Sequence, residues 1–140
     1  MPIETATHLW LEAGNMSGGS RNQIEFSEEL IQFFDDESRA SEKLFIAFDS
    51  KVKAYCPLAS RGQDYGQWAN IWRLGLITED KGGVSYPGRI IHFEKKLVGK
   101  RYVYLIEVVD HGSDEHMALS AKAIFIGVTG GAEGRAYGYW

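Results

Sequence analysis

Residues 58–74 hold the side chains of this chain that are best suited to binding another molecule. An arginine presents a planar fork to guanine or phosphate, glutamine and asparagine pair in two-point fashion with adenine, and tyrosine and tryptophan offer stacking surfaces. The segment supplies all of these around its glycines: Arg61, Gln63, Tyr65, Gln67, Trp68 and Asn70. The pattern favours nucleic-acid binding, and it also suits an ordinary loop followed by an amphipathic helix with Trp68 and Trp72 in the core.

A second polar cluster, residues 110–116, combines His111 and His116 with three acidic side chains. These groups are common metal ligands, but the same composition is typical of a tight turn between two strands, which is the interpretation we prefer. The chain has no phosphate-binding loop, no Gly-x-Ser-x-Gly elbow and no His-Glu-x-x-His motif. We therefore expect no catalytic residue, no metal and no cofactor in this chain.

The elements that position these side chains are expected to form one domain, since 140 residues with 44% hydrophobic content support a single core. We assign this domain to residues 1–129 and interpret the glycine-rich residues 130–140 as a tail or linker. No apolar run approaches the roughly 20 residues of a membrane span, and the first residues lack the order of a secretory signal. Cys56 is the only cysteine, which excludes an internal disulfide. A soluble, cytoplasmic protein without a membrane partner is the expectation.

Charge is unevenly distributed along the chain. The net charge of −4 argues against a nonspecific nucleic-acid coat, because such proteins are usually basic. Residues 25–50 contain eight acidic side chains, whereas residues 81–101 contain six basic side chains against Glu94 alone. Such an arrangement orients a protein on a phosphate backbone, although each run also suits a solvated face.

The pattern of apolar residues predicts a mainly β, α+β fold. Strands are expected at 7–13, 24–26, 43–48, 51–56, 89–93, 101–109 and 118–128, where β-branched and aromatic residues gather or alternate with polar ones. A short helix of about ten residues should start at Ser27, which is followed by Glu28 and Glu29, and end in the acidic residues from Asp35. A second short helix is expected over residues 65–74. Seven strands with two short helices indicate an open pseudobarrel.

Two polar arms leave this predicted sheet. The first arm, residues 17–23, precedes the second strand, and the second arm, residues 60–70, follows the fourth. Both arms carry long hydrogen-bonding side chains, and their glycines allow the backbone to approach a phosphate or a groove closely. Paired arms of this kind can grip opposite edges of a major groove.

With these arms and this order of elements, the chain resembles the DNA-binding pseudobarrel shared by plant B-three transcription factors and the recognition domains of certain restriction enzymes, the EcoRII-like effector domains among them. Residues 11–34 carry the resemblance, with a glycine-rich arm, a strand and a short helix bearing apolar anchors. The second arm matches the family by position, with fewer basic residues. The resemblance implies sequence-specific binding of double-stranded DNA, with a CCWGG-type site as the natural guess.

The resemblance also implies which residues contact DNA. Those of the first arm would be Ser17, Ser20, Arg21, Asn22 and Gln23, and those of the second arm Arg61, Gln63, Asp64, Tyr65, Gln67, Trp68 and Asn70. Candidates for phosphate contacts are Lys51, Lys53, Arg73, Lys95, Lys96 and Lys100. The recognition domain of this family is not itself catalytic. The chain would therefore be a monomeric part of a type II restriction endonuclease whose nuclease domain follows the glycine-rich end.

Two further functions fit parts of the sequence. Residues 92–128 alternate like the outer strands of a hotdog-type thioesterase or small-molecule-binding domain, although the helix after Ser27 is short for that fold. A protein-interaction module with Trp68 and Trp72 as an exposed anchor is the other alternative. A dimer that hydrolyses acyl-CoA would indicate the hotdog, and a monomer without enzymatic activity would indicate the recognition domain.

Overall fold

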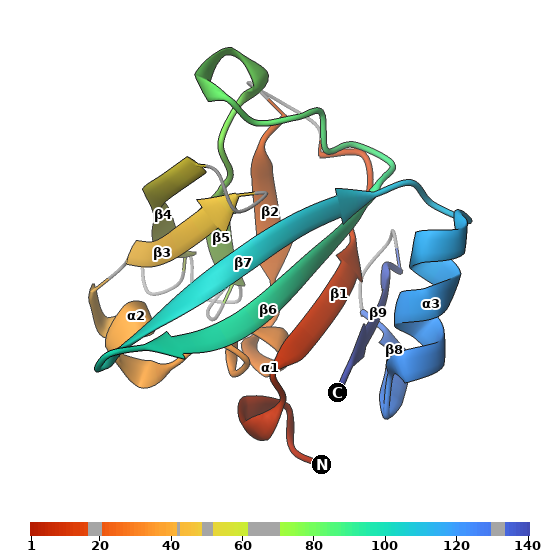
Figure 1. Cartoon of the computed structure of the whole chain (residues 1–140), viewed down its shortest axis with the longest axis horizontal. Helices are drawn as coiled ribbons and strands as arrows, with labels where there is room; N and C mark the ends of the chain where they lie inside the picture. The colour runs from red at the N-terminus through yellow and green to blue at the C-terminus, as the bar shows by residue number, and fades with distance from the viewer. Residues whose placement is uncertain (17–20, 42, 49–51, 62–70, 130–133) are drawn as a thin grey trace.

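The computed structural model describes residues 1–16, 21–41, 43–48, 52–61, 71–129 and 134–140, with backbone alone at 41, 43, 48, 52–61 and 71. These residues form nine strands and three α-helices (Figure 1). The strands are β1 (His8–Glu12), β2 (Gln23–Phe26), β3 (Lys43–Phe48), β4 (Val52–Arg61), β5 (Ile71–Gly75), β6 (Ile90–Val98), β7 (Arg101–Val109), β8 (Phe125–Val128) and β9 (Ala136–Tyr139). The helices are α1 (Glu28–Ile31), α2 (Asp36–Ser41) and α3 (Asp114–Lys122), and 3-10 turns lie at η1 (Ile3–Thr5) and η3 (Glu79–Lys81).

All nine strands belong to one curled sheet, in the order β2-β5-β4-β3-β7-β6-β1-β9-β8. Neighbouring strands are antiparallel except β3 and β7, which run parallel. The edge strands β2 and β8 do not pair with each other, so the sheet stays open rather than closing into a barrel. The predicted mainly β, α+β class is confirmed, with nine strands in place of the expected seven and three helices in place of two.

The inner face of the curled sheet surrounds the main core, because the strands alternate as the period of two requires. Leu9 and Leu11 of β1 and Ile24 and Phe26 of β2 are fully buried in this core. The core is rich in aromatic rings that meet edge to face: Phe26, Phe34 and Phe93 contact one another, and Tyr104 contacts Phe34. Each such pair contributes about 0.5–1.5 kcal/mol beyond the area that it buries.

Helix α1 begins where the sequence predicts it. The Ser27 hydroxyl accepts a hydrogen bond from the Leu30 backbone N–H at 3.3 Å, which caps the first turn. The acidic segment that follows does not unwind as expected but forms α2. The reason is a second cap, since the Asp35 carboxylate accepts hydrogen bonds from the Ser38 N–H, at 3.3 Å, and the Ser38 hydroxyl.

Residues 110–122 also differ from the expected turn and strand. Ser113 caps α3 by accepting from the His116 N–H at 3.2 Å, and Asp114 and Glu115 lie in the first turn. The helix packs Leu119 against a second, smaller core on the outer face of β1, β6 and β9, where Trp10 is buried. The predicted strand over 118–128 therefore exists only at its end, as β8.

The last part of the expected second helix forms a strand, and so does the last part of the expected tail. Residues 71–75 form β5, because Trp72 and Leu74 alternate inward and both edges of the strand are paired, with β2 and β4. Residues 136–139 form β9, which lies between β1 and β8 with Tyr137 and Tyr139 buried. The described part of the glycine-rich end thus belongs to the domain and is not a linker. The rest of the expected helix, residues 65–70, lies outside the described residues.

Candidate nucleic-acid interface

The two arms attach to opposite ends of one strand pair, the β2–β5 ladder. The first arm enters β2 at Gln23, which pairs with Gly75 at the last residue of β5. The second arm leaves β4 at Arg61 and enters β5 at Ile71, and these two residues also pair with each other. From Ile71 to Gly75 the chain advances four residues, which is about 14 Å in an antiparallel strand. The points of attachment of the two arms are therefore about 14 Å apart.

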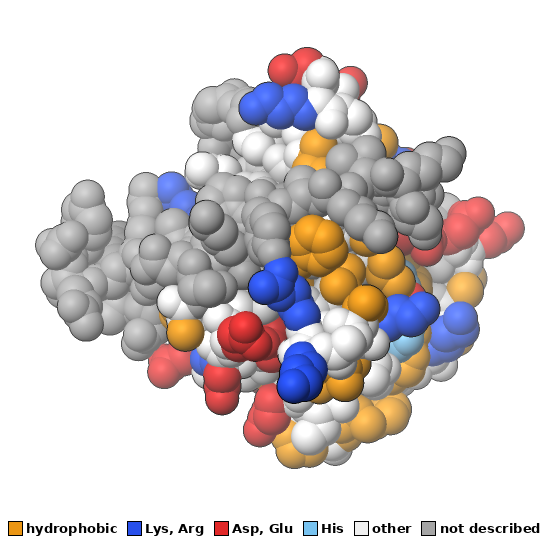
Figure 2. Space-filling model, turned by 60° about the vertical axis from the view of Figure 1, so that its left-hand side comes forward, with side chains coloured by type: hydrophobic (Ala, Val, Ile, Leu, Met, Phe, Trp, Pro, Cys, Tyr) orange, Lys and Arg blue, Asp and Glu red, His pale blue; other side chains and the backbone are white. Residues whose placement is uncertain are grey.

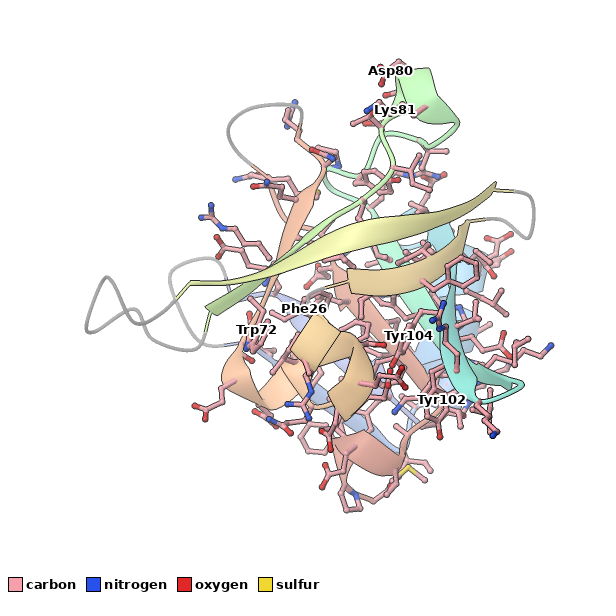
Figure 3. The ribbon with its side chains drawn as sticks, turned by 90° about the vertical axis from the view of Figure 1, so that its left-hand side faces the viewer. Phe26, Trp72, Asp80, Lys81, Tyr102 and Tyr104 are labelled. Atoms are coloured by element: carbon pink, nitrogen blue, oxygen red, sulfur yellow. The ribbon has the colours of Figure 1, made fainter. Side chains whose placement is uncertain are left out.

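Most of the predicted base-contacting residues of the arms lie outside the described residues: Ser17, Ser20, Gln63, Asp64, Tyr65, Gln67, Trp68 and Asn70. Arg61 is described by its backbone alone, at the end of β4. Arg21, Asn22 and Gln23 are described, and they lie together where the first arm meets β2. Trp72, the other half of the proposed exposed anchor, packs against the main core (Figure 3).

The base of the first arm is held by its own hydrogen bonds. Asn22 donates its side-chain N–H to the Leu76 carbonyl at 2.6 Å, and the Leu76 N–H donates to the Asn22 carbonyl at 2.8 Å. Arg21 has a left-handed backbone, with φ of 55°, and its guanidinium donates to the Asn15 carbonyl at 3.2 Å. The bonds of Asn22 join the end of the arm to the segment after β5, and that of Arg21 joins it to the Asn15 carbonyl before the arm. Asn22 is therefore a residue that orients the arm in this structure.

Between the two arms, the outer face of the ladder carries Gln23, Glu25 and Arg73, which we call the outer strip. Ile24 and Phe26 point into the core, so the residues that alternate with them point out. The Arg73 guanidinium binds the Glu25 carboxylate through two nitrogens, with Nη2 at 2.7 Å and Nε at 2.9 Å from Oε1. Arg73 is less exposed than its partner, with 29% of its side chain accessible against 48%. The strip therefore holds a guanidinium and a carboxylate that are bonded to each other in this structure.

Arg135 lies in the segment that the sequence predicts to be a tail, and it joins two strands behind this strip. Its guanidinium donates to the Glu25 carbonyl at 2.7 Å and to the Glu12 carbonyl at 3.3 Å, so it joins the free edge of β2 to the end of β1. The Glu12 carboxylate in turn accepts from the Ala136 N–H. Nothing in the local pattern of residues 134–140 distinguishes Arg135, because its partners are 110 and 123 positions away in the chain.

A pocket of about 440 Å³ lies beside the base of the first arm. Arg21 and Asn22 form one wall, and Asp80 and Tyr86 belong to the segment that forms the other. The Tyr86 hydroxyl donates to the Ile77 carbonyl, which holds this second wall in place. The pocket extends the polar surface of the arm toward η3, at one end of the β2–β5 ladder.

The described residues that are predicted to contact phosphates lie at two different places in the structure. Arg73 lies on the outer strip, whereas Lys95, Lys96 and Lys100 lie on the β6–β7 hairpin. Figure 3 shows Trp72 of β5 and Tyr102 of that hairpin on opposite sides of the ribbon. The ammonium of Lys95 lies over the Phe33 ring, 4.9 Å from its centre, and burial lowers its pKa. The side chains of Lys51 and Lys53 lie outside those described.

The hairpin lysines therefore do not extend the surface between the arms. On the face that Figure 2 presents, the described basic side chains are scattered among acidic and apolar ones and form no continuous basic surface.

The two histidines of residues 110–116 contact other groups of the protein. His111 Nε2 is 3.1 Å from the Glu12 carboxylate, and His116 Nδ1 accepts from the Gly112 N–H at 2.9 Å. In the part of the chain that the structure describes, no three His, Cys, Asp or Glu side chains are grouped so that they could hold a metal ion. No helix in the same part is both long and apolar enough to cross a membrane.

No protein-family model matches the chain, and no curated protein matches it either. The candidate interface is therefore supported by its geometry alone.

Proposed function

We propose that this protein binds double-stranded DNA in a sequence-specific manner, with its two arms in the major groove on either side of the outer strip. The observation that carries the proposal is the separation of the arms. Their attachment points are about 14 Å apart across the β2–β5 ladder, and the major groove of B-DNA is about 12 Å wide. Two arms so spaced can follow the two walls of one groove, with the strip facing its floor.

The chemistry of the strip suits this position. An arginine fork binds the O6 and N7 acceptors of guanine, and a carboxylate accepts from the cytosine amino group. Arg73 and Glu25 offer both groups within one ion pair. Gln23 lies at the end of the same strip and can pair in two-point fashion with adenine.

The order of elements supports the more specific form of the proposal. A polar arm between β1 and β2, a capped short helix after β2 and a second arm between β4 and β5 follow the order that the resemblance to restriction-enzyme recognition domains implies. We extend the proposal accordingly to an effector domain of a type II restriction endonuclease, with a CCWGG-type site. In that role the chain reads DNA, and a separate domain cuts it.

The hotdog alternative gains no comparable observation. That fold needs a long apolar helix inside the sheet, and the longest helix in the described residues is α3, with nine residues and only Leu119 buried.

Fluorescence anisotropy with labelled duplexes tests the proposal. A duplex with CCWGG is compared with one of equal length in which the site is scrambled, at one fixed salt concentration, because phosphate contacts alone respond strongly to salt. Arg73→Ala should weaken binding to the intact site by about 1–3 kcal/mol, or roughly 5- to 140-fold. Lys100→Ala, at an exposed cation in the turn of the β6–β7 hairpin, should leave the affinity unchanged and is the matched control.

Different results would test the role of Arg61, the CCWGG site and DNA binding as a whole. Arg61→Ala should lower the affinity by a similar factor if Arg61 makes a two-point guanine contact. Equal weak binding to both duplexes would remove the CCWGG site, and a selection from randomised duplexes would then decide whether any sequence is preferred. No binding to any duplex would overturn the proposal.

A further inference from the structure

One edge of the sheet is apolar and uncovered in the described chain. Five large hydrophobic side chains between residues 117 and 128 are from 42% to 65% exposed: Met117 in α3, Ile124 just before β8, and Phe125, Ile126 and Val128 in β8. The other exposed large hydrophobic side chains in the described residues are Met1, Leu97 and Val98. Concentration of exposed apolar groups in one short segment is typical of an interaction surface.

The backbone of this segment is also suited to pairing. Among the strands that the structure describes, β8 ends the sheet and is bonded on one side only, to β9. An edge strand normally carries a charge, a proline or a bulge that prevents pairing with another chain. Strand β8 has the sequence Phe-Ile-Gly-Val and carries no charged residue and no proline.

We propose that β8 pairs antiparallel with β8 of a second copy of this chain, which makes the protein a weak homodimer with one sheet continuous through both copies. A two-fold axis would bring each strand opposite itself, so a charged strand would meet like charge. The uncharged β8 avoids this repulsion, although each copy carries a net charge of −4. The strand can therefore pair with itself through backbone hydrogen bonds without charge repulsion within the strand.

The exposed area agrees with a weak dimer. An aromatic side chain buries on the order of 150–250 Å² and an aliphatic one roughly 100 Å², so the four partly exposed side chains between residues 124 and 128 present about 300 Å² per copy. Two copies would then bury about 600 Å² of apolar side chain in addition to the paired backbone, which is below the size of a stable interface. We therefore expect a weak dimer that forms only at high protein concentration.

The dimer contact does not use the residues proposed to bind DNA. Strands β2 and β8 are the two edges of the curled sheet, and Arg135 links them, since its backbone carbonyl accepts from the Thr129 N–H after β8 and its guanidinium donates to the Glu25 carbonyl of β2. Pairing through β8 involves residues 125–128 and no residue of the outer strip. A dimer would contradict the monomer that the sequence predicts, so a measurement of the molecular mass in solution decides between the two states.

Sedimentation velocity over a concentration series tests the proposal. The mass of the unmodified protein should rise from 15.7 kDa toward twice that value with concentration, and Ile126→Lys should remain monomeric throughout. Leu97→Lys is the matched control, because Leu97 is 59% exposed, close to the 55% of Ile126, but lies on the β6–β7 hairpin. Val128→Lys, at a side chain 65% exposed, is the second variant should Ile126→Lys fail to fold.

Hydrogen exchange gives an independent readout of the same contact. Backbone amides of β8 should become at least several-fold better protected at high protein concentration, and those of the β6–β7 hairpin should not change. A monomer at all concentrations up to about 1 mM would overturn the proposal. Self-association that persists in Ile126→Lys and Val128→Lys would overturn it as well.

Discussion

Lowering the pH should weaken the fold through a partly buried pair of histidines. His8 of β1 and His92 of β6 face each other, with 2.9 Å between Nδ1 of His8 and Nε2 of His92. Trp140 stacks on both rings, with ring centres 4.3 Å and 5.7 Å apart. A hydrogen bond between two ring nitrogens uses one proton and one lone pair, so protonation of both rings would turn two N–H groups and two positive charges toward each other.

The size of the effect follows from the surroundings of His92. Burial is the main cause that lowers the pKa of His92 to about 4, and the charges of His8 and Lys122 act in the same direction. The pKa of His8 is also lowered, chiefly by burial and in part by Lys122, while Glu94 acts to raise it. The carboxylate of Glu107, 3.9 Å from His92 Nδ1, faces the pair from β7.

The direction of the change follows from proton binding in the two states. In the unfolded chain His92 takes up its proton near pH 6.5, whereas in the folded protein it does so only near pH 4. Between these values the unfolded state binds more protons, so the free energy of unfolding falls as the pH falls. A difference of that size corresponds to roughly 3 kcal/mol, fully lost by about pH 4.

Urea unfolding at a series of pH values measures this loss. The variant His92→Gln keeps a side-chain N–H for His8 but cannot titrate, so the carboxylates common to both proteins cancel in the comparison. Between about pH 6.5 and pH 4 the unmodified protein should lose roughly 3 kcal/mol more than the variant, with an unchanged slope in urea. Parallel pH profiles in the two proteins would refute the argument that this pair is held neutral by burial.

Two further substitutions test the packing of the cores. Gly138→Ala should destabilise the protein by about 1–3 kcal/mol, measured as a lower Tm, because a Cβ there would lie 2.5 Å from the indole nitrogen of the buried Trp10; an unchanged Tm would contradict the close approach of β9 to β1. Tyr104→Phe should cost a further, independent ~1–3 kcal/mol in urea unfolding, since the Tyr104 hydroxyl accepts from the Asp35 N–H at 2.7 Å and donates to the Asp35 carboxylate. Burial acts to raise the pKa of Asp35, yet the hydrogen bonds from Ser38 and Tyr104 hold it below its usual value. The carboxyl should therefore titrate at higher pH in Tyr104→Phe, which NMR would detect, and the same titration in both proteins would refute that assignment.

Local patterns account for much of the fold. The predicted strand at residues 101–109 is β7, and the helix predicted at Ser27 begins there because a hydroxyl cap and acidic residues act within one turn. The start of α3 follows the same rule, with Ser113 before Asp114 and Glu115, and its signal was therefore present in the sequence. The cluster was instead interpreted as a turn, since its composition suits both.

Composition alone also located the arms, as polar segments before β2 and after β4. Their relation to each other depends on strand pairing. Residues 71–74 were expected to be helical, yet they form β5 because β2 and β4 bond to both edges of that segment. This pairing places the two arms at opposite ends of one ladder and brings Arg73 to Glu25, 48 residues away in the chain.

The sequence by itself determined the mainly β class, the short capped helices and the presence of two polar arms, because alternation, caps and composition act over a few neighbouring residues. Only the tertiary structure decided that residues 136–139 are strand β9, that Arg135 bonds the edge of β2, and that β8 is an apolar edge among the described strands. Each of these depends on which strands meet. Hydrogen bonds between strands join residues far apart in the chain, and no local pattern specifies the partner.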